Sequence, residues 1–341
     1  MLRTIPRSRP LARGLLSFVS SALETHSRGN TLGTVSAESC YSIFLRHVCL
    51  LRQAGATAMP RTVAELGPGT SLGTGFVALL AGATKYYALD LIDFTDLELN
   101  LRIFDELVML FRRRAPIPAT GVHSRRFPDL DTYEFPDFLA IAPDTEFQQR
   151  AAAIRADIAA RSGHFVQMAV PWTTTPVVPQ QAIDWIFSQS VLEHIDELSK
   201  AYRALARFLK PSGYMSHLID FGSHGATRDW NGHWALNERM WHVVRGRLPY
   251  LLNRLPYSEH RRLADDAGFV TVFEKKNKNF DGLLTEQFAP RFRNISDEDA
   301  RLRMVLIISQ LSAKAADLYE DEVAARSERA LPAESAIEQA A

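Results

Sequence analysis

A loop with three glycines, set between an acidic residue and an apolar run, carries the clearest chemical signal of the chain. Glu65 precedes the loop, and its glycines are Gly67, Gly69 and Gly73. Glycine lets a backbone turn sharply and lie close to a ligand because no Cβ intrudes. Asp90 follows about 20 residues later, where a carboxylate can accept hydrogen bonds from ribose hydroxyls. The pattern predicts a site for a nucleotide-like ligand.

The spacing of the glycines indicates which nucleotide. The dinucleotide fingerprint is G-x-G-x-x-G, whereas this loop reads G-x-G-x-x-x-G. No Lys followed by Ser or Thr ends the loop, which disfavours a phosphate-cradling P-loop. The flanking runs 63–66 and 86–90 are typical of strands, and 76–80 of a helix between them. We therefore expect a β-α-β unit with two adjacent parallel strands.

Four stretches together resemble a known family. The Glu-x-Gly-x-Gly sequence and the later Asp90 are similar to the first two motifs of class I S-adenosylmethionine-dependent methyltransferases. Residues 183–195 resemble the fourth-strand motif of that family, and Leu-Lys-Pro-Ser-Gly at 209–213 resembles its usual helix-to-strand turn. The resemblance implies an α/β, Rossmann-like, doubly wound fold with a mostly parallel seven-stranded sheet. It also implies S-adenosyl-L-methionine as the cofactor.

The resemblance assigns cofactor contacts residue by residue. It implies that Glu65 contacts the amino-acid part of the cofactor, directly or through water. The loop after the third strand holds adenine in this family, often with an Asp, and this chain departs from the pattern with Pro171 and Trp172. Ligands of such sheets bind at the carboxyl ends of the strands. The predicted cofactor residues are Glu65, Gly67, Gly69, Gly73, Asp90, Pro171, Trp172, Ser188 and Gln189.

Methylation of a hydroxyl requires a base that takes the proton, and histidine suits this near neutral pH. The predicted catalytic residues are His194, Asp220 and His224. His194 is expected in the first turn of the helix after the fourth strand, with a structural hydrogen bond as the alternative role. Asp220 ends a strand on the cleft side, whereas His217 lies mid-strand and is expected in the core.

The segment 221–257 is rich in His, Trp and Asn. Clustered histidines and acids are metal-ligand types, but their spacing here matches no ligand signature, and no metal site is predicted. Apolar rings with interleaved polar groups suit a sugar-like acceptor, and they equally suit a hydrophobic lid. Ser216-His217-x-Ile219-Asp220 and Ala267-Gly268-Phe269 also resemble methyltransferases encoded with bacterial surface-polysaccharide assembly enzymes.

The apolar patterns divide the chain into four parts. Residues 1–58 are expected to form a helical extension, with helices around 11–23 and 39–52. The methyltransferase domain is expected over 59–290, with an insert at 112–163, a candidate lid or acceptor-site wall, and the acceptor-side segment 221–257. A C-terminal helix is predicted over 291–314. The Ala- and Glu-rich tail 315–341 is predicted to be disordered.

Composition narrows the class of protein. The 39 basic and 39 acidic side chains of the 341 residues balance, so no overall basic field favours nucleic acid. The two cysteines cannot build a disulfide framework, which fits a reducing, cytoplasmic setting. No run approaches the ~20 apolar residues of a membrane span. The Arg-rich residues 1–28 resemble a transit peptide in composition, and an amphipathic helix is the preferred interpretation. The oligomeric state is left open.

The sequence therefore predicts a methyltransferase that acts on a hydroxyl of a sugar or other small molecule. An N- or C-methyltransferase of the same fold is one alternative. A cofactor-binding scaffold without activity is another. A nicotinamide-dependent oxidoreductase is a third, which the glycine spacing disfavours.

Overall fold

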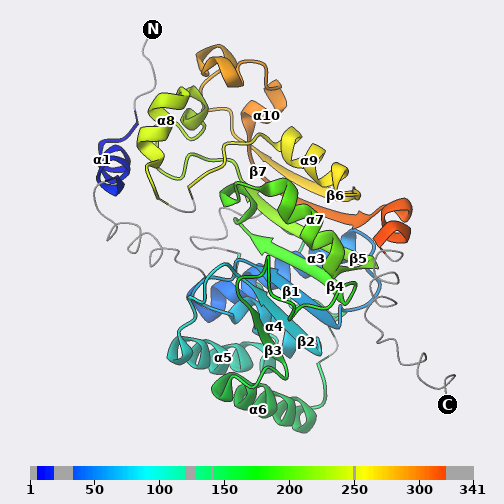
Figure 1. Ribbon diagram of the computed structural model, residues 1–341. Coiled ribbons are helices and arrows are strands. Elements are labelled where there is room, and N and C mark those ends of the chain that lie inside the picture. The colour runs from blue at the N-terminus through cyan, green and yellow to red at the C-terminus, as the bar shows by residue number, and fades with distance from the viewer. Residues whose placement is uncertain (1–5, 19–33, 120–127, 140, 249–250, 320–341) are drawn as a thin grey trace, which may run out of the picture.

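The sheet orders the molecule. In the computed structural model, which describes residues 6–18, 34–119, 128–139, 141–248 and 251–319, seven strands pair in the order β3-β2-β1-β4-β5-β7-β6 (Figure 1). Their bounds are β1 Thr62–Leu66, β2 Lys85–Leu89, β3 Val166–Ala169, β4 Ile183–Gln189, β5 Leu209–Asp220, β6 Phe269–Lys278 and β7 Leu302–Leu311. The first five are parallel to one another, and β7 is antiparallel to both β5 and β6. The predicted Rossmann-like α/β fold is confirmed.

Helices cover both faces of the sheet. The α-helices are α1 Ser8–Ser17, α3 Ala37–Gln53, α4 Gly73–Leu80, α5 Leu97–Arg112, α6 Asp144–Ala160, α7 Leu198–Phe208, α8 Glu238–Arg245, α9 Tyr257–Asp266 and α10 Asp297–Arg301. Four short 3₁₀ helices are η2 Leu192–His194, η3 Gly232–Ala235, η4 Thr285–Gln287 and η5 Pro290–Phe292. None of the helices in this described part of the chain has the length and apolar character that crossing a bilayer requires.

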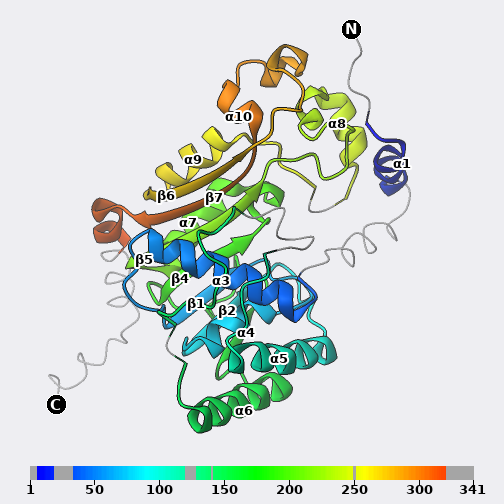
Figure 2. The same ribbon diagram turned by 180° about the vertical axis from the view of Figure 1, so that it is seen from behind.

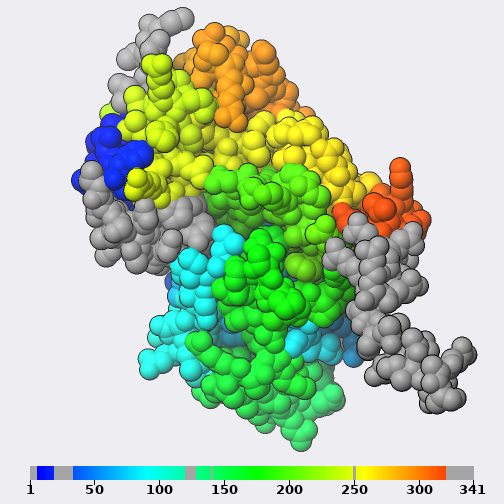
Figure 3. Space-filling model, in the orientation of Figure 1, coloured from blue at the N-terminus to red at the C-terminus, as the bar shows by residue number. Residues whose placement is uncertain are grey.

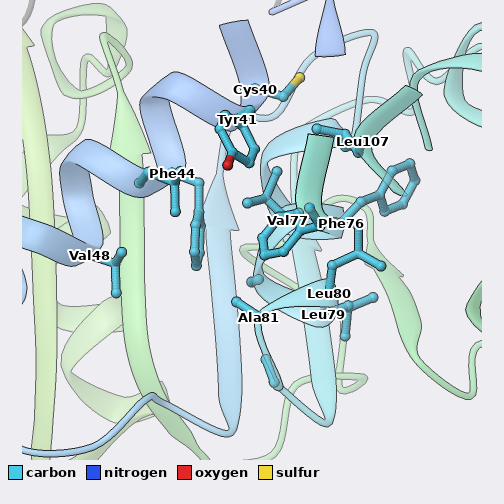
Figure 4. Close-up of a cluster of buried hydrophobic side chains, with 14 of the residues drawn as sticks. Cys40, Tyr41, Phe44, Val48, Phe76, Val77, Leu79, Leu80, Ala81 and Leu107 are labelled. Atoms are coloured by element: carbon cyan, nitrogen blue, oxygen red, sulfur yellow. The ribbon is translucent and has the colours of Figure 1, made fainter. Parts of the chain in front are cut away.

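Two apolar cores lie on opposite sides of the sheet. On one side α3, α4 and α5 pack together, as seen from behind (Figure 2). Phe44 of α3 and Phe76 of α4 lie in this core and are fully buried (Figure 4). The other core contains side chains of α7 and α9, such as Leu205 and Ala264. Because both faces are covered, most residues of the central strands are buried, as is usual for parallel sheets.

The predicted C-terminal helix over 291–314 is wrong. Residues 302–311 form β7, which pairs with β5 along 214–220 and with β6 along 269–278. Val305, Leu306 and Ile308 are fully buried. A continuous apolar run cannot be assigned to helix or strand by periodicity alone, and here partners on both sides favour the strand. The predicted disordered tail is also wrong at its start, since residues 313–319 are helical; residues 320–341 lie outside the described part.

The N-terminal region splits into two separate contacts. The predicted helix over 39–52 is confirmed as α3, whose first turn is capped by Ser36. The other helix starts at Ser8 rather than near residue 11, and residues 19–33 are outside the described set. Gly14 of α1 lies against the backbone of Val243 and Val244 in α8, where a Cβ would stand 2.1 Å from a carbonyl oxygen. Figure 3 shows the blue α1 against the yellow-green surface of α8.

The insert predicted at 112–163 contains α6, which packs on α5 and β3. Its described loop runs along α3: Tyr41 donates to the carbonyl of Ala115, and Arg46 donates to those of Pro118 and Pro128. Residues 120–127 are outside the description, so a lid or wall formed by them stays a prediction. The described loop residues stabilise α3 through these hydrogen bonds.

Candidate active site

The carboxyl ends of β1, β2, β4 and β5 meet at one edge of the sheet because these strands are parallel neighbours. The glycine loop follows β1, and Asp90 follows β2. His194 follows β4, and Asp220 ends β5. Most of the predicted site residues are thereby brought to a single edge, which is where open α/β sheets bind ligands.

The glycine loop needs its glycines for conformation and for space. Gly67 and Gly69 have φ values of +68° and +72°, a left-handed region in which other residues are strained. A Cβ on Gly67 would lie 2.8 Å from the side chain of Val191, just beyond β4. A Cβ on Gly73 would lie 2.4 Å from the sulfur of Cys40. The loop is therefore closely packed against the β4 end on one side and against α3 on the other.

Glu65 lies in β1, just before the glycine loop, and its hydrogen bonds hold the residues around the loop in place. It is buried and accepts a hydrogen bond from the Tyr86 hydroxyl at 2.8 Å, with further bonds from Thr74 and the backbone of Gly75. Burial raises its pKa to about 8. A Cβ on Gly75 would lie 2.1 Å from the Tyr86 ring, so this glycine makes room for that ring. Contact between Glu65 and the cofactor stays a prediction.

Asp90 closes the loop from the side of β2. Its carboxylate accepts from the backbone N–H of Gly69 at 3.2 Å and of Leu91 at 2.7 Å. Burial raises its pKa, and these backbone bonds oppose that rise. Asn100 of α5, which the sequence analysis missed, accepts from the N–H of Leu72 at 2.7 Å and donates to the carbonyl of Thr70. A carboxylate beside a glycine backbone suits ribose hydroxyls, so the residues present fit the predicted cofactor.

Most of the remaining predicted cofactor residues have side chains that are buried or already hydrogen-bonded within the protein. The backbone N–H of Trp172 donates to the carbonyl of Asp90 at 2.9 Å, but the indole is buried in the core on the α7 side. Pro171 follows a cis peptide bond and is exposed. Ser188 is fully buried and hydrogen-bonds His217 at 2.7 Å, while Gln189 hydrogen-bonds a histidine of α3. His217 lies in the core as expected.

A cluster of charged and titratable side chains lies at the ends of β4 and β5. We define this polar cluster by its members, Glu193, His194, Asp220, His224 and Arg303. The His194 and His224 rings stand edge to face with centroids 5.0 Å apart. His224 Nε2 lies 3.4 Å from Asp220 Oδ2 and 4.0 Å from Glu193 Oε1. The three predicted catalytic residues are thus adjacent.

The charges of the polar cluster shift the pKa values of its acids in opposite directions. Burial and the neighbouring Asp220 raise the pKa of Glu193 well above its usual range. Burial also acts to raise the pKa of Asp220, but His224 and the guanidinium of Arg303 outweigh it and lower that pKa to about 2. Arg303 binds the other Asp220 oxygen, Oδ1. Two neighbouring carboxyl groups whose pKa values are shifted in opposite directions are typical of a functional site.

The predicted placement of His194 in a helix is wrong in detail. The residue lies in the 3₁₀ helix η2, and α7 begins only at Leu198. Asn253 explains the interruption. Its side-chain amide donates to the carbonyls of Leu192 and Ile195, at 2.9 and 3.0 Å, and its backbone N–H donates to the carbonyl of Glu193 at 2.8 Å. These carbonyls would otherwise accept from a continuing α-helix.

Three residues of this region were missed from the sequence. Glu193 stood in the fourth-strand motif, and its burial was the signal that only the fold could supply. The helix predicted over 291–314 includes Arg303, so nothing in the sequence places this residue beside Asp220. Asn253 acts on residues about 60 positions earlier, and no local pattern indicates this.

Most Trp and Asn side chains of the segment 221–257 have structural roles, either in the core or in hydrogen bonds to the backbone. Trp234 and Trp241 are buried, and the Trp234 indole donates to the carbonyl of Arg254. The Asn231 side chain bonds the backbone of residues 283 and 300. Trp230 is half-buried, with Arg303 over its ring. Trp230 is therefore a partly exposed aromatic residue of this segment that contacts the polar cluster.

Comparison with known proteins gives one family match and likenesses to solved structures. Residues 136–216 match the model of a family described as a methyltransferase domain. A search of curated proteins finds no match. Among solved structures, an S-adenosylmethionine-dependent methyltransferase of Mesorhizobium loti is 13% identical, with 78% of this chain and 97% of that chain covered at a TM-score of 0.39. A second, from Methanosarcina mazei, is 11% identical, covering 77% and 96% at 0.41.

The family match, the strand order and the glycine loop with its paired acid define the class of protein. The chain contains a methyltransferase domain, to which residues 136–216 belong. The strand order and the glycine loop are those expected of the class I, Rossmann-like superfamily that the sequence motifs resemble, for which S-adenosyl-L-methionine is the expected cofactor.

Proposed function

We propose that this methyltransferase acts on a hydroxyl of a small molecule, a sugar or another compound of similar size. The observation that carries the proposal is the polar cluster, in which His224 lies 3.4 Å from Asp220 and edge to face with His194. A hydroxyl must lose its proton as it is methylated, and a histidine beside a carboxylate suits that task. We assign His194, Asp220 and His224 together as the catalytic residues.

The proposed acceptor position follows from one contact of the chain and from the residue order next to it. Gly67 packs against Val191, and Val191 directly precedes η2, which carries His194. The polar cluster therefore adjoins the loop that we assign to the cofactor. When bound, S-adenosyl-L-methionine supplies an activated methyl group on a sulfonium. The task of the chain is to hold an acceptor oxygen next to that group, which is worth ~7–11 kcal/mol in favourable cases.

The proposed cofactor residues are those predicted from the sequence, with two kinds of role. Gly67, Gly69 and Asp90 present backbone and carboxylate to the ligand. Glu65 is proposed to act on the amino-acid part, through water if it keeps its bond to Tyr86. Backbone groups of Pro171 and Trp172 are proposed for adenine, with Ser188 and Gln189 at the back of the site. The proposed setting is the cytoplasm, which suits the unpaired Cys40 and Cys49.

A sugar is one member of the proposed acceptor class. The Trp230 ring is proposed to pack on the C–H face of a sugar, and the polar side chains around it to hydrogen-bond the sugar hydroxyls. The other tryptophans named above are in the core, so they do not add to this argument. No nucleic acid is proposed as a partner, because acidic and basic residues balance.

The test is product analysis. Purified protein is incubated with S-adenosyl-L-methionine and a panel of hydroxyl-bearing acceptors, including nucleotide sugars, with matched amine-bearing compounds. Mass spectrometry detects the added methyl group, and NMR distinguishes O–CH₃ from N–CH₃ and C–CH₃. We expect O-methyl products. N- or C-methyl products would establish the alternative chemistry, and cofactor binding with no product across the panel would favour the inactive scaffold.

A further inference from the structure

We propose that Glu193, His194 and His224 form a binding site for one divalent transition-metal ion. One ring nitrogen from each histidine and one carboxylate oxygen all lie within 4.8 Å of one another. Ligand atoms about 2.0–2.2 Å from a common ion stand roughly 3–4 Å apart, so small side-chain rotations complete the set. The inference deepens the proposed function, and rests on it for the claim that the acceptor binds here.

Glu193 supplies an independent observation. The residue is 2% exposed, and its Oε1 accepts from the backbone N–H of Asp220 at 3.3 Å. Its other oxygen, Oε2, is buried and has no hydrogen-bond partner among the described residues. An unsatisfied buried carboxyl oxygen is costly unless a cation or donor meets it. A divalent cation would stabilise the ionised form of this carboxyl, whose pKa burial otherwise raises.

The surroundings hold the three side chains in place. Asp220 Oδ2 lies 3.4 Å from His224 Nε2, the ring nitrogen that also lies 4.0 Å from Glu193 Oε1, so Asp220 holds the His224 ring with this nitrogen toward the proposed site. Arg303 is bound to the same Asp220, and the Asp220 carboxylate offsets the positive charge of Arg303 next to the site. Asn253 fixes the η2 turn that carries Glu193 and His194. The site is therefore held by bonds that do not involve the proposed ion.

The donor set selects the kind of ion. Two imidazoles and one carboxylate suit Zn²⁺ and similar first-row divalent ions, whereas Mg²⁺ and Ca²⁺ prefer oxygen ligands only. Ligand spacing in the sequence could not predict this site, because the ligands come from two segments about 30 residues apart. An ion here would lower the pKa of an acceptor hydroxyl bound to it. His194 and His224 would then serve as ligands in place of acting as the base, the acceptor hydroxyl would give its proton to water, and Asp220 would be a positioning residue.

The experiment is a titration of the full chain, stripped with a chelator, with Co²⁺ as a visible-light probe of a histidine-containing site. We expect one equivalent to bind, with Zn²⁺ displacing it and Mg²⁺ failing to do so. Glu193→Gln and His224→Asn should each weaken Co²⁺ binding by more than about tenfold, since even outer-shell changes cost ~10–100-fold. His164→Asn, which changes an exposed histidine before β3, is the matched control and should bind like the wild type.

Each variant is first checked for binding of S-adenosylhomocysteine, which shows that it is folded. Failure of the wild type to bind Co²⁺, or equal binding by folded His224→Asn, would overturn the metal site. Full methyl transfer by the chelated protein would overturn the inference that the ion acts on the acceptor hydroxyl, while leaving the proposed function intact. Metal binding without O-methylation of any acceptor would contradict the proposed function and leave the metal site standing.

Discussion

The glycine loop and the polar cluster lie at the same sheet edge but are built in different ways. The loop is held by contacts within a short stretch: Gly69 and Asp90 are 21 residues apart, and Leu72 and Asn100 are 28 apart. The polar cluster joins Asp220 to Arg303, 83 residues away, and Asn253 to Leu192, 61 residues away. The region that we assign to the cofactor can thus be recognised from its local sequence, whereas the region that we assign to the acceptor forms only in the folded chain.

This difference predicts that a substitution in the polar cluster changes the rate of methyl transfer without changing the affinity for the cofactor. Replacement of His224 by Ala should lower the rate of methyl transfer by ~10²–10⁴-fold, because an acid–base or ligand group next to the acceptor is lost. The affinity for S-adenosylhomocysteine should not change, since that side chain lies outside the glycine loop. Steady-state rates and calorimetry on the same preparation measure both effects. An unchanged rate would remove the polar cluster from catalysis.

Glu65 allows a test of the loop that needs no acceptor. Its pKa is about 8 in the folded chain against 4.5 as the ordinary value, so the folded state holds a proton that the unfolded state has lost. Stability from this group is fully present below pH 4.5 and is lost as pH rises to 8. The slope is up to ~1.4 kcal/mol per pH unit. Denaturant unfolding at several pH values should show a smaller loss for Glu65→Gln.

The control for that measurement is Glu106→Gln, which changes an exposed acid on α5. It should follow the wild-type dependence on pH. A Glu65→Gln variant with the wild-type slope would mean that this carboxyl is ionised in the folded chain, and that it does not lie in the buried bonding arrangement described here.

Replacement of Asp90 tests the cofactor assignment through a smaller expected effect, a loss of binding affinity. Asp90→Ala should weaken S-adenosylhomocysteine binding by roughly 10- to 100-fold, because charge-assisted hydrogen bonds contribute ~1.5–3 kcal/mol. Asp93→Ala, three residues further along and exposed, should bind normally. Isothermal titration calorimetry measures both. Equal affinity of the Asp90 variant would contradict the ribose assignment.

Asn253 gives the smallest expected effect and tests how the acceptor region is held. Asn253→Ala removes two donors to the η2 carbonyls and should cost ~1–3 kcal/mol of stability. Methyl transfer should slow while cofactor affinity is kept. Asn237→Ala, which removes the α8 N-cap, is the matched control, with a stability cost of ~1 kcal/mol and no change in rate. Equal rates in both variants would show that η2 needs no such support.

Local sequence was enough for the sheet order near β1 and for the placement of Gly67, Gly69 and Asp90. It failed where partners far along the chain decide the outcome. The run 302–311 was assigned to a helix, because its apolar residues are continuous and its strand partners lie at 214–220 and 269–278. The same error hid Arg303. The composition of 221–257 suits a sugar-like acceptor and a hydrophobic lid equally, and only the packing of the α7 side shows that Trp234 is buried.

The measurement that tests the account most directly is calorimetric titration of the purified chain with S-adenosylhomocysteine, with NADH as the comparison. The account predicts micromolar binding of S-adenosylhomocysteine and none of NADH, because the loop spacing and the Asp90 carboxylate suit the former. Binding of NADH alone, or of neither compound, would contradict the assignment of the glycine loop to S-adenosyl-L-methionine.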